Sequence, residues 1–197
     1  MDNVTISEET HNLLKKEKKM TGTKDIRHDG IILRRYTIDD VPMIHLELGC
    51  DPDMLEFTGW NPYASQESTA EMVRGFIYSY EHFNGSYSWI INDGTRDGGT
   101  IGAYDYDAEN STIEIGYSIF KSCWGRGFAT KSVAAATNYL MEEEGIGKVT
   151  AWTAADNTAS IRALEKNGFA VVETDVNGLD IDGVKHDRIV FEKAAHT

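Results

Sequence analysis

The segment from Ser111 to Ala154 constrains the fold more than any other part of the chain. Its first ten residues, STIEIGYSIF, alternate apolar side chains with small or polar ones, which is the period of a β-strand with two different faces. The loop KSCWGRG then leads into a long helix-forming run that ends at Gly145, and GKVTAWTA follows as a further strand. A strand, a helix and a strand in this order predict a βαβ crossover.

The other periodic segments place this crossover in a mixed sheet. Strand patterns occupy residues 31–37, 86–93, 99–107, 170–177 and 186–193, and helical patterns occupy 39–49, 65–83 and 157–168. The resulting order is strand, two helices, three strands, helix, strand, helix and two strands. It predicts an α+β fold: a twisted, mostly antiparallel sheet of about seven strands, about four helices and one central βαβ unit.

The length of 197 residues suits one domain, which we place at residues 30–197. Residues 1–29 are polar and are expected to form a tail, either flexible or one short helix opened by the capping-box pattern from Thr5 to Glu8. No apolar run approaches a bilayer span and no export signal is visible, so we expect no membrane partner. The two cysteines, Cys50 and Cys123, form no closely spaced pair, which favours a reducing cytoplasm.

The charge of the chain is uneven. The net charge of -13 argues against nucleic acid as a partner and favours a cationic acceptor. Yet the 27 residues from Ile115 to Met141 contain no Asp or Glu, where the mean density predicts about four, and they keep Lys121, Arg126 and Lys131. A buried strand and helix would also exclude acids, but an anionic ligand explains the retained cations as well.

The glycine loop fits only one of three phosphate-binding designs. A P-loop needs Gly-Lys-Ser/Thr where this chain has GFA, and the dinucleotide fingerprint needs a third glycine where it has Thr130. The remaining design uses backbone N–H groups at a helix N-terminus, which bind a pyrophosphate without a metal. Gly125 and Gly127 suit such a loop, although glycine pairs also occur at strand-to-helix turns for packing reasons alone.

Three features together resemble the GNAT superfamily of acetyl-CoA-dependent N-acetyltransferases, over roughly residues 30–193. They are the strand IEIGYSIF, the element order, and the string NxxSxxxxxxxGF that begins at Asn157 and includes Ser160. The family loop usually has Gln/Arg-x-x-Gly-x-Gly/Ala, and here WGRGFA begins with Trp124. With a tryptophan in this place, the loop is similar to those of the RimJ and RimL branch, the ribosomal-protein N-terminal acetyltransferases.

The resemblance implies acetyl-CoA as co-substrate and no metal. The backbone of Gly125 to Thr130 would hold the CoA pyrophosphate, the strand edge at Ser118 to Phe120 would pair with the pantetheine arm, and the three cations would screen the phosphates. The residues expected to contact acetyl-CoA are Ser118, Ile119, Phe120, Gly125, Arg126, Gly127, Phe128, Ala129, Thr130 and Asn157.

Acetyl transfer from a thioester to an amine needs a neutral amine and a group that stabilises the leaving thiolate. Many family members place a tyrosine for this purpose seven residues after the asparagine, but Leu164 stands there. In the RimL-like branch a serine at the place of Ser160 contacts the thiol; the alternative is a helix cap. Asn157 likewise is either a helix cap or a residue that binds the pantetheine arm. Glu114 is the candidate base, with an ordinary solvated carboxylate as the alternative.

The acceptor is expected against the first two helices and the loop that carries Trp60, Asn61 and Tyr63. His186 and Asp187 are weaker candidates for acceptor contacts, and Tyr117 is assigned to the core. The leading function is transfer of acetyl to a protein N-terminal α-amine, such as that of a ribosomal protein, by direct attack in a ternary complex. The alternatives are acetylation of a small amine (polyamine, antibiotic or amino acid) and non-catalytic sensing of acyl-CoA. A homodimer is possible in each case.

Overall fold

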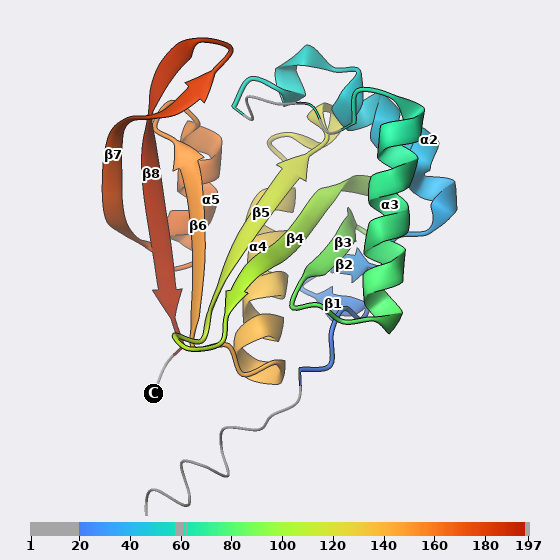
Figure 1. Ribbon diagram of the computed structural model, residues 1–197, viewed down its shortest axis with the longest axis horizontal. Helices are drawn as coiled ribbons and strands as arrows, with labels where there is room; N and C mark the ends of the chain where they lie inside the picture. The colour runs from blue at the N-terminus through green and yellow to red at the C-terminus, as the bar shows by residue number, and fades with distance from the viewer. Residues whose placement is uncertain (1–19, 58–60, 62, 196–197) are drawn as a thin grey trace, which may run out of the picture.

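The computed structural model describes residues 20–57, 61 and 63–195. Eight strands form one sheet (Figure 1): β1 (Ile26–His28), β2 (Ile31–Arg34), β3 (Tyr87–Asn92), β4 (Asp97–Asp107), β5 (Thr112–Ile119), β6 (Lys148–Ala154), β7 (Ala170–Ile181) and β8 (Val184–Ala194). The α-helices within the described residues are α2 (Val41–Ile44), α3 (Gln66–Glu81), α4 (Phe128–Asn138) and α5 (Thr158–Lys166). None of these helices has both the length and the apolar character needed to cross a membrane.

The strand order in the sheet is β1-β2-β3-β4-β5-β6-β8-β7. Every neighbouring pair is antiparallel except β5 and β6, which are joined through α4. The predicted α+β fold with a mostly antiparallel sheet and a central βαβ unit is therefore confirmed. The eighth strand, β1, is an addition to the seven expected, because its three residues are too few to show a period.

Residues 20–28, which the sequence placed in an N-terminal tail, pack on the domain. Strand β1 pairs with β2 at the edge of the sheet. The carboxylate of Glu144, which is only 3% exposed, accepts hydrogen bonds from the backbone N–H of Thr21 (2.7 Å) and the hydroxyls of Tyr139 (2.6 Å) and Tyr87 (2.9 Å). A buried carboxylate needs such donors, so they fix this segment against the end of α4. The expected tail 1–29 thus ends earlier, and its residues 1–19 lie outside the described part.

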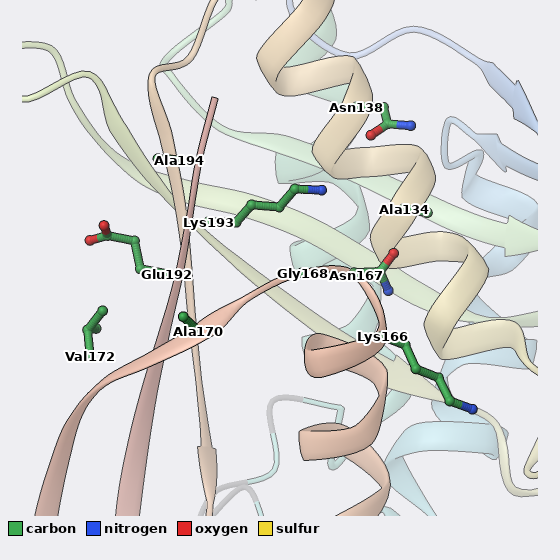
Figure 2. Close-up of a pocket in the computed structure, with 10 residues that line it drawn as sticks. All are labelled: Ala134, Asn138, Lys166, Asn167, Gly168, Ala170, Val172, Glu192, Lys193 and Ala194. Carbon is green, nitrogen blue, oxygen red and sulfur yellow. The ribbon is translucent and has the colours of Figure 1, made fainter. Parts of the chain in front are cut away.

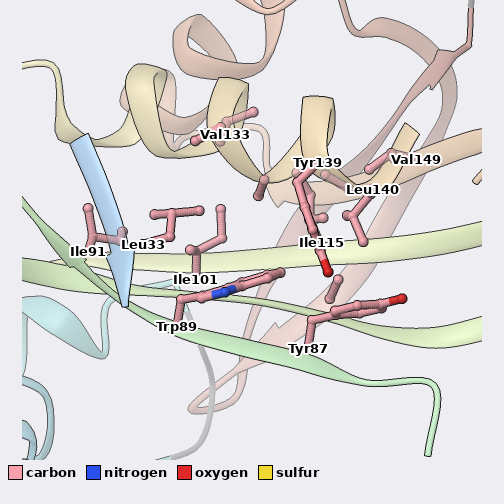
Figure 3. Packing of buried hydrophobic residues seen from close by; sticks show 14 of the residues in the cluster. Leu33, Tyr87, Trp89, Ile91, Ile101, Ile115, Val133, Tyr139, Leu140 and Val149 are labelled. Carbon is pink, nitrogen blue, oxygen red and sulfur yellow. The ribbon is translucent and has the colours of Figure 1, made fainter. Parts of the chain in front are cut away.

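Helices cover both faces of the sheet. Helices α4 and α5 lie behind it in Figure 1, and α2 and α3 lie in front. The larger apolar cluster lies between the sheet and α4 (Figure 3) and includes Leu33, Trp89, Ile91, Ile101, Ile115, Val133, Leu140 and Val149. The smaller cluster joins α2, α3 and the other face through Tyr36, Val41, Ile44, Leu48, Val73, Ile90 and Phe120. Each fully buried side chain of this size contributes about 1.5–3 kcal/mol to the free energy of folding, which rigidifies both layers around the central strands.

Candidate functional site

The two parallel strands at the centre of the sheet separate halfway along their length. Their pairing joins Thr112 to Lys148, Ile113 to Val149 and Glu114 to Thr150, and it ends there. Beyond this point residues 115–119 remain paired with β4, and residues 151–154 remain paired with β8. Figure 1 shows β5 and β6 diverging from their common end. The second half of β5 therefore has one edge without a strand partner among the described residues.

The backbone groups of alternate residues face this open edge. Phe120 donates its N–H to the carbonyl of Gly98 on β4 (2.9 Å), so the backbone groups of Ile119 point the other way, toward β6. The indole Nε1 of Trp124 donates to the Ile119 carbonyl at 2.7 Å. Phe120 itself offers nothing at the edge, because its carbonyl accepts from Cys123 (2.8 Å) and its side chain is buried in the smaller cluster. Its predicted contact with acetyl-CoA has no free group to make it.

The loop after β5 leads into the N-terminus of α4 without a side-chain cap. Gly125 and Gly127 have φ angles of 72° and 82°, in the left-handed region that favours glycine, and a Cβ at either position would meet nothing within 4 Å. Gly127 is the N-cap residue and has no side chain to offer. The N–H groups of Phe128, Ala129 and Thr130 come before the first intrahelical bond, from Lys131 to Gly127. Free N–H donors and the helix dipole favour an anion at such a helix start, and the binding of a pyrophosphate there stays a prediction.

The three cations expected to screen phosphates have different positions. Lys121 forms ion pairs with Asp53 and, at 3.7 Å, with Asp51. Lys131 pairs with Asp29 at 3.6 Å. Arg126 is exposed in the loop and has no acidic partner among the described residues. Both lysines thus have acidic partners distant in sequence, and of these three cations only Arg126 lacks one among the described residues. Screening of phosphates by the three stays a prediction.

The first turn of α5 brings together two predicted residues and one that was assigned to the core. The Asn157 side chain caps the helix by accepting the N–H of Ser160 at 3.1 Å, so the cap role is present. The Ser160 hydroxyl does not cap; it lies 2.9 Å from the hydroxyl of Tyr117 on β5. Burial raises the pKa of Tyr117 to about 12, so the phenol stays protonated near neutral pH. Leu164, in place of the family tyrosine, is buried in the core.

Glu114 lies on the opposite face of β5 from Tyr117. Its neighbours Ile113 and Ile115 are buried in the α4 cluster, so the Glu114 side chain points to the face of α2 and α3. The indole of Trp152 on β6 donates to its carboxylate at 3.0 Å, and the Tyr104 hydroxyl on β4 forms a second hydrogen bond. Burial raises the pKa of Glu114, while both hydrogen bonds act to lower it. The result is a half-buried carboxylate at the point where β5 and β6 part, which is more basic than an ordinary glutamate.

The residues expected to contact the acceptor are only partly described. Trp60 lies outside the described residues. Tyr63 packs against the smaller cluster, and burial raises its pKa to about 12. Asn61 donates to the carbonyl of Gly49 at 2.9 Å, which ties the loop to the π-helical turn His45–Gly49 that follows α2. The acceptor role of these residues stays a prediction.

His186 and Asp187, the weaker candidates for acceptor contacts, stabilise the hairpin of β7 and β8. His186 Nδ1 lies 2.9 Å from Asp156, the residue before the α5 cap, and Asp187 accepts the N–H of Asn177 at 2.9 Å. Both therefore hold the β7–β8 hairpin, with His186 fixing it to the start of α5.

A hollow of about 600 Å³ lies elsewhere, between the second half of α4, the turn from α5 to β7, and the end of β8 (Figure 2). Its lining includes Asn138, Lys166 and Lys193, and none of the predicted site residues. The candidate site is instead the open edge of β5 with the two helix starts beside it.

Sequence reasoning missed Tyr104, Trp152 and the hydroxyl of Tyr117. For Trp152 a signal existed: strand alternation puts it on the face opposite the buried Val149 and Ala151, which is also the face of Glu114. No local pattern indicates which hydroxyl will meet Ser160.

An open strand edge, an uncapped helix start and a half-buried carboxylate thus lie together where β5 and β6 part. The model of the acetyltransferase (GNAT) domain matches residues 31–170, and the chain belongs to this family of N-acetyltransferases.

Named relatives agree with this assignment. The uncharacterized N-acetyltransferase YoaA of Bacillus subtilis (strain 168) is 30% identical over 72% of this chain and 80% of its own length. The putative ribosomal N-acetyltransferase YdaF of the same organism is 28% identical over 67% and 74%. Among solved structures, the ribosomal L7/L12 α-N-protein acetyltransferase RimL in complex with coenzyme A has a TM-score of 0.79 and 22% identity, covering 87% of this chain and 98% of RimL.

Proposed function

We propose that the protein acetylates the N-terminal α-amine of a ribosomal protein in the cytoplasm. Acetyl-CoA as donor is supported by one observation above the others: the uncapped start of α4 presents three N–H donors next to the open edge of β5. The choice of acceptor is supported by the likeness to RimL, by the relative named for ribosomal acetylation, and by Trp124 at the start of the loop.

The residues present fit acetyl-CoA. The loop from Gly125 to Thr130 would hold the pyrophosphate through backbone N–H groups, and Arg126, which has no acidic partner among the described residues, would add charge. The edge of β5 at Tyr117 and Ile119 would pair with the pantetheine arm. In this proposal Tyr117 and Ile119, rather than Phe120, pair with the pantetheine arm. Space above both glycines leaves room for a ligand to approach the backbone.

Bound acetyl-CoA supplies an activated acetyl thioester. The acceptor nitrogen forms a bond to the acetyl carbon as the C–S bond breaks, and the amine loses one proton. Glu114 accepts this proton, directly or through a water molecule, and the hydroxyl of Ser160 donates a hydrogen bond to the departing thiolate. An α-amine titrates near pH ~8, against ~10.4 for lysine, so it needs less help from a base at neutral pH.

The test is an acceptor panel with the full chain. Saturating acetyl-CoA should raise the melting temperature, because it binds the folded state alone. Thiol release should then be fastest with a peptide that begins with Ser or Ala. A matched peptide with a blocked N-terminus and one internal lysine is the control and should not react.

The other outcomes decide between the alternatives. Faster release with spermidine or an aminoglycoside would make the protein a small-molecule acetyltransferase. Binding of acetyl-CoA without reaction of any amine would favour a sensor. An unmoved melting curve would overturn the acetyl-CoA site itself.

A further inference from the structure

Side chains from three strands surround Glu114. Trp152 comes from β6, Tyr104 from β4 and Arg188 from β8. The first two donate hydrogen bonds to the carboxylate, and the positive charge of Arg188 also acts on it. The cluster thus spans the sheet on both sides of the place where the central pairing ends.

The position of Trp152 depends on that divergence. The last pair of the two strands is Glu114 and Thr150, and Trp152 follows two residues later on the same face of β6. Its side chain therefore extends from the separating strand back to β5, where Nε1 lies 3.0 Å from Glu114 Oε1. An indole has a single donor, and here it is spent on this one carboxylate.

The position of Tyr104 depends on a glycine. Tyr104 is directly opposite Glu114 in the antiparallel pair of β4 and β5, and its ring extends over Gly116. A Cβ on Gly116 would lie 2.6 Å from the Tyr104 hydroxyl oxygen, closer than side chains tolerate. The absence of a side chain at this place allows the hydroxyl to reach the carboxylate.

We propose that Trp152 and Tyr104 are positioning residues that hold the Glu114 carboxylate as the base of the transfer reaction. This inference rests on the role given to Glu114 in the proposed function. An ionised carboxylate has about four lone-pair sites, so two donors fix its orientation and leave sites for the proton of the acceptor amine. Neither residue needs to touch a substrate for this purpose.

The charges around Glu114 set the direction of the expected effects. Burial raises its pKa, the hydrogen bonds from Tyr104 and Trp152 lower it, Asp105 on β4 raises it, and Arg188 on β8 lowers it. Removing either donor therefore raises the pKa of Glu114. Because a base must be deprotonated to act, the acid limb of the rate profile then moves to higher pH.

The first experiment follows the Trp152 indole N–H signal by ¹⁵N NMR and needs no acceptor. The signal is assigned by its loss in Trp152→Phe. In the wild type it should titrate with Glu114, and in Glu114→Gln it should stay constant with pH. In Tyr104→Phe the midpoint should rise by about one pH unit, the effect of one hydrogen bond to a charged group.

The second experiment measures the pH profile of kcat/KM with the best acceptor of the panel. Trp152→Phe and Tyr104→Phe should both move the acid limb upward, with rates converging on the wild type at high pH. Tyr106→Phe is the matched control: it removes a hydroxyl from the same strand, at a residue that packs against the α4 cluster. Its profile should match the wild type.

The two experiments separate the inference from the proposed function. An indole signal that does not titrate, or a midpoint unchanged in Tyr104→Phe, would overturn the positioning role whatever the activity. A titrating indole in a protein that acetylates no amine would leave the cluster intact and refute only the base role of Glu114. Melting curves of each variant identify any loss of folding.

Discussion

The hydroxyl oxygens of Tyr117 and Ser160 lie 2.9 Å apart and so connect the open half of β5 to the first turn of α5. The two residues are 43 positions apart in the sequence and meet only because α5 follows β6 back across this face. A hydroxyl is available here although the tyrosine usual in the family is Leu164 in this chain.

Ser160→Ala should lower kcat by at least about tenfold with little change in KM, because it removes the hydroxyl that we propose donates a hydrogen bond to the leaving thiolate. Tyr117→Phe should have a smaller effect in the same direction, since it frees the serine hydroxyl to rotate. Steady-state rates of thiol release measure both. Equal rates in wild type and Ser160→Ala would exclude the serine from the reaction.

Gly127→Ala should lower stability by about 1–2 kcal/mol, the cost of a left-handed conformation for a residue with a Cβ. Gly94→Ala is a matched control, because Gly94 has a φ of 90° and equally open surroundings in the turn between β3 and β4. Both variants should lose similar stability in urea denaturation. Only Gly127→Ala should reduce the rise in melting temperature that acetyl-CoA produces; a similar reduction in both would contradict the loop assignment.

Arg126→Ala should weaken acetyl-CoA binding by about two- to fivefold, as expected for one exposed charge pair. The effect should shrink as salt is added, because exposed charges are screened. Lys121→Ala is the comparison, since its ammonium is occupied by Asp51 and Asp53. Titration calorimetry at two salt concentrations would measure the acetyl-CoA affinity of both variants. A larger loss of affinity in Lys121→Ala than in Arg126→Ala would contradict this prediction.

Glu144→Gln should reduce the free energy of unfolding by about 1–3 kcal/mol, because hydrogen bonds to a buried charge are replaced by weaker ones. Burial disfavours the charged form, but hydrogen bonds from Thr21, Tyr139 and Tyr87 outweigh this and lower the pKa of Glu144. A lowered pKa contributes stability that is complete above the unfolded value and is lost as the pH falls through the folded one.

The wild type should therefore lose more stability on acidification below about pH 5 than Glu144→Gln does. Glu143→Gln is the control from the adjacent position: Glu143 is exposed, pairs with Lys24, and should change stability by less than about 1 kcal/mol. Urea denaturation over a pH series measures all three proteins. Parallel curves for wild type and Glu144→Gln would refute the role of this carboxylate.

The elements with a clear period were predictable from sequence. The alternation around Ile113 and Ile115 identified β5, and Gly127 marked the start of α4 because a positive φ there favours glycine. Strand β1 has three residues, too few to show alternation. The packing of Thr21 depends on Glu144, 123 residues away, and no local pattern carries that information.

The candidate site was predictable to the extent that it depends on the backbone. The N–H donors at α4 follow from the loop spacing, whereas the partners of side chains do not. Lys121 was expected to face a phosphate and instead contacts Asp53, because the fold brings the loop after α2 against the loop after β5. Tyr117 was assigned to the core by its place in the alternation, and its ring does pack there, but its hydroxyl extends to Ser160.

The hydrogen bond from Trp124 to Ile119 bears on how the chain avoids aggregation. An unpaired strand edge is a template for a strand of another molecule, and such an edge at the centre of a sheet would seed aggregates. The indole occupies one acceptor of that edge at 2.7 Å and places a bulky ring beside it. Trp124 thus occupies a backbone acceptor at the open edge of β5 that a strand of a neighbouring molecule would otherwise use.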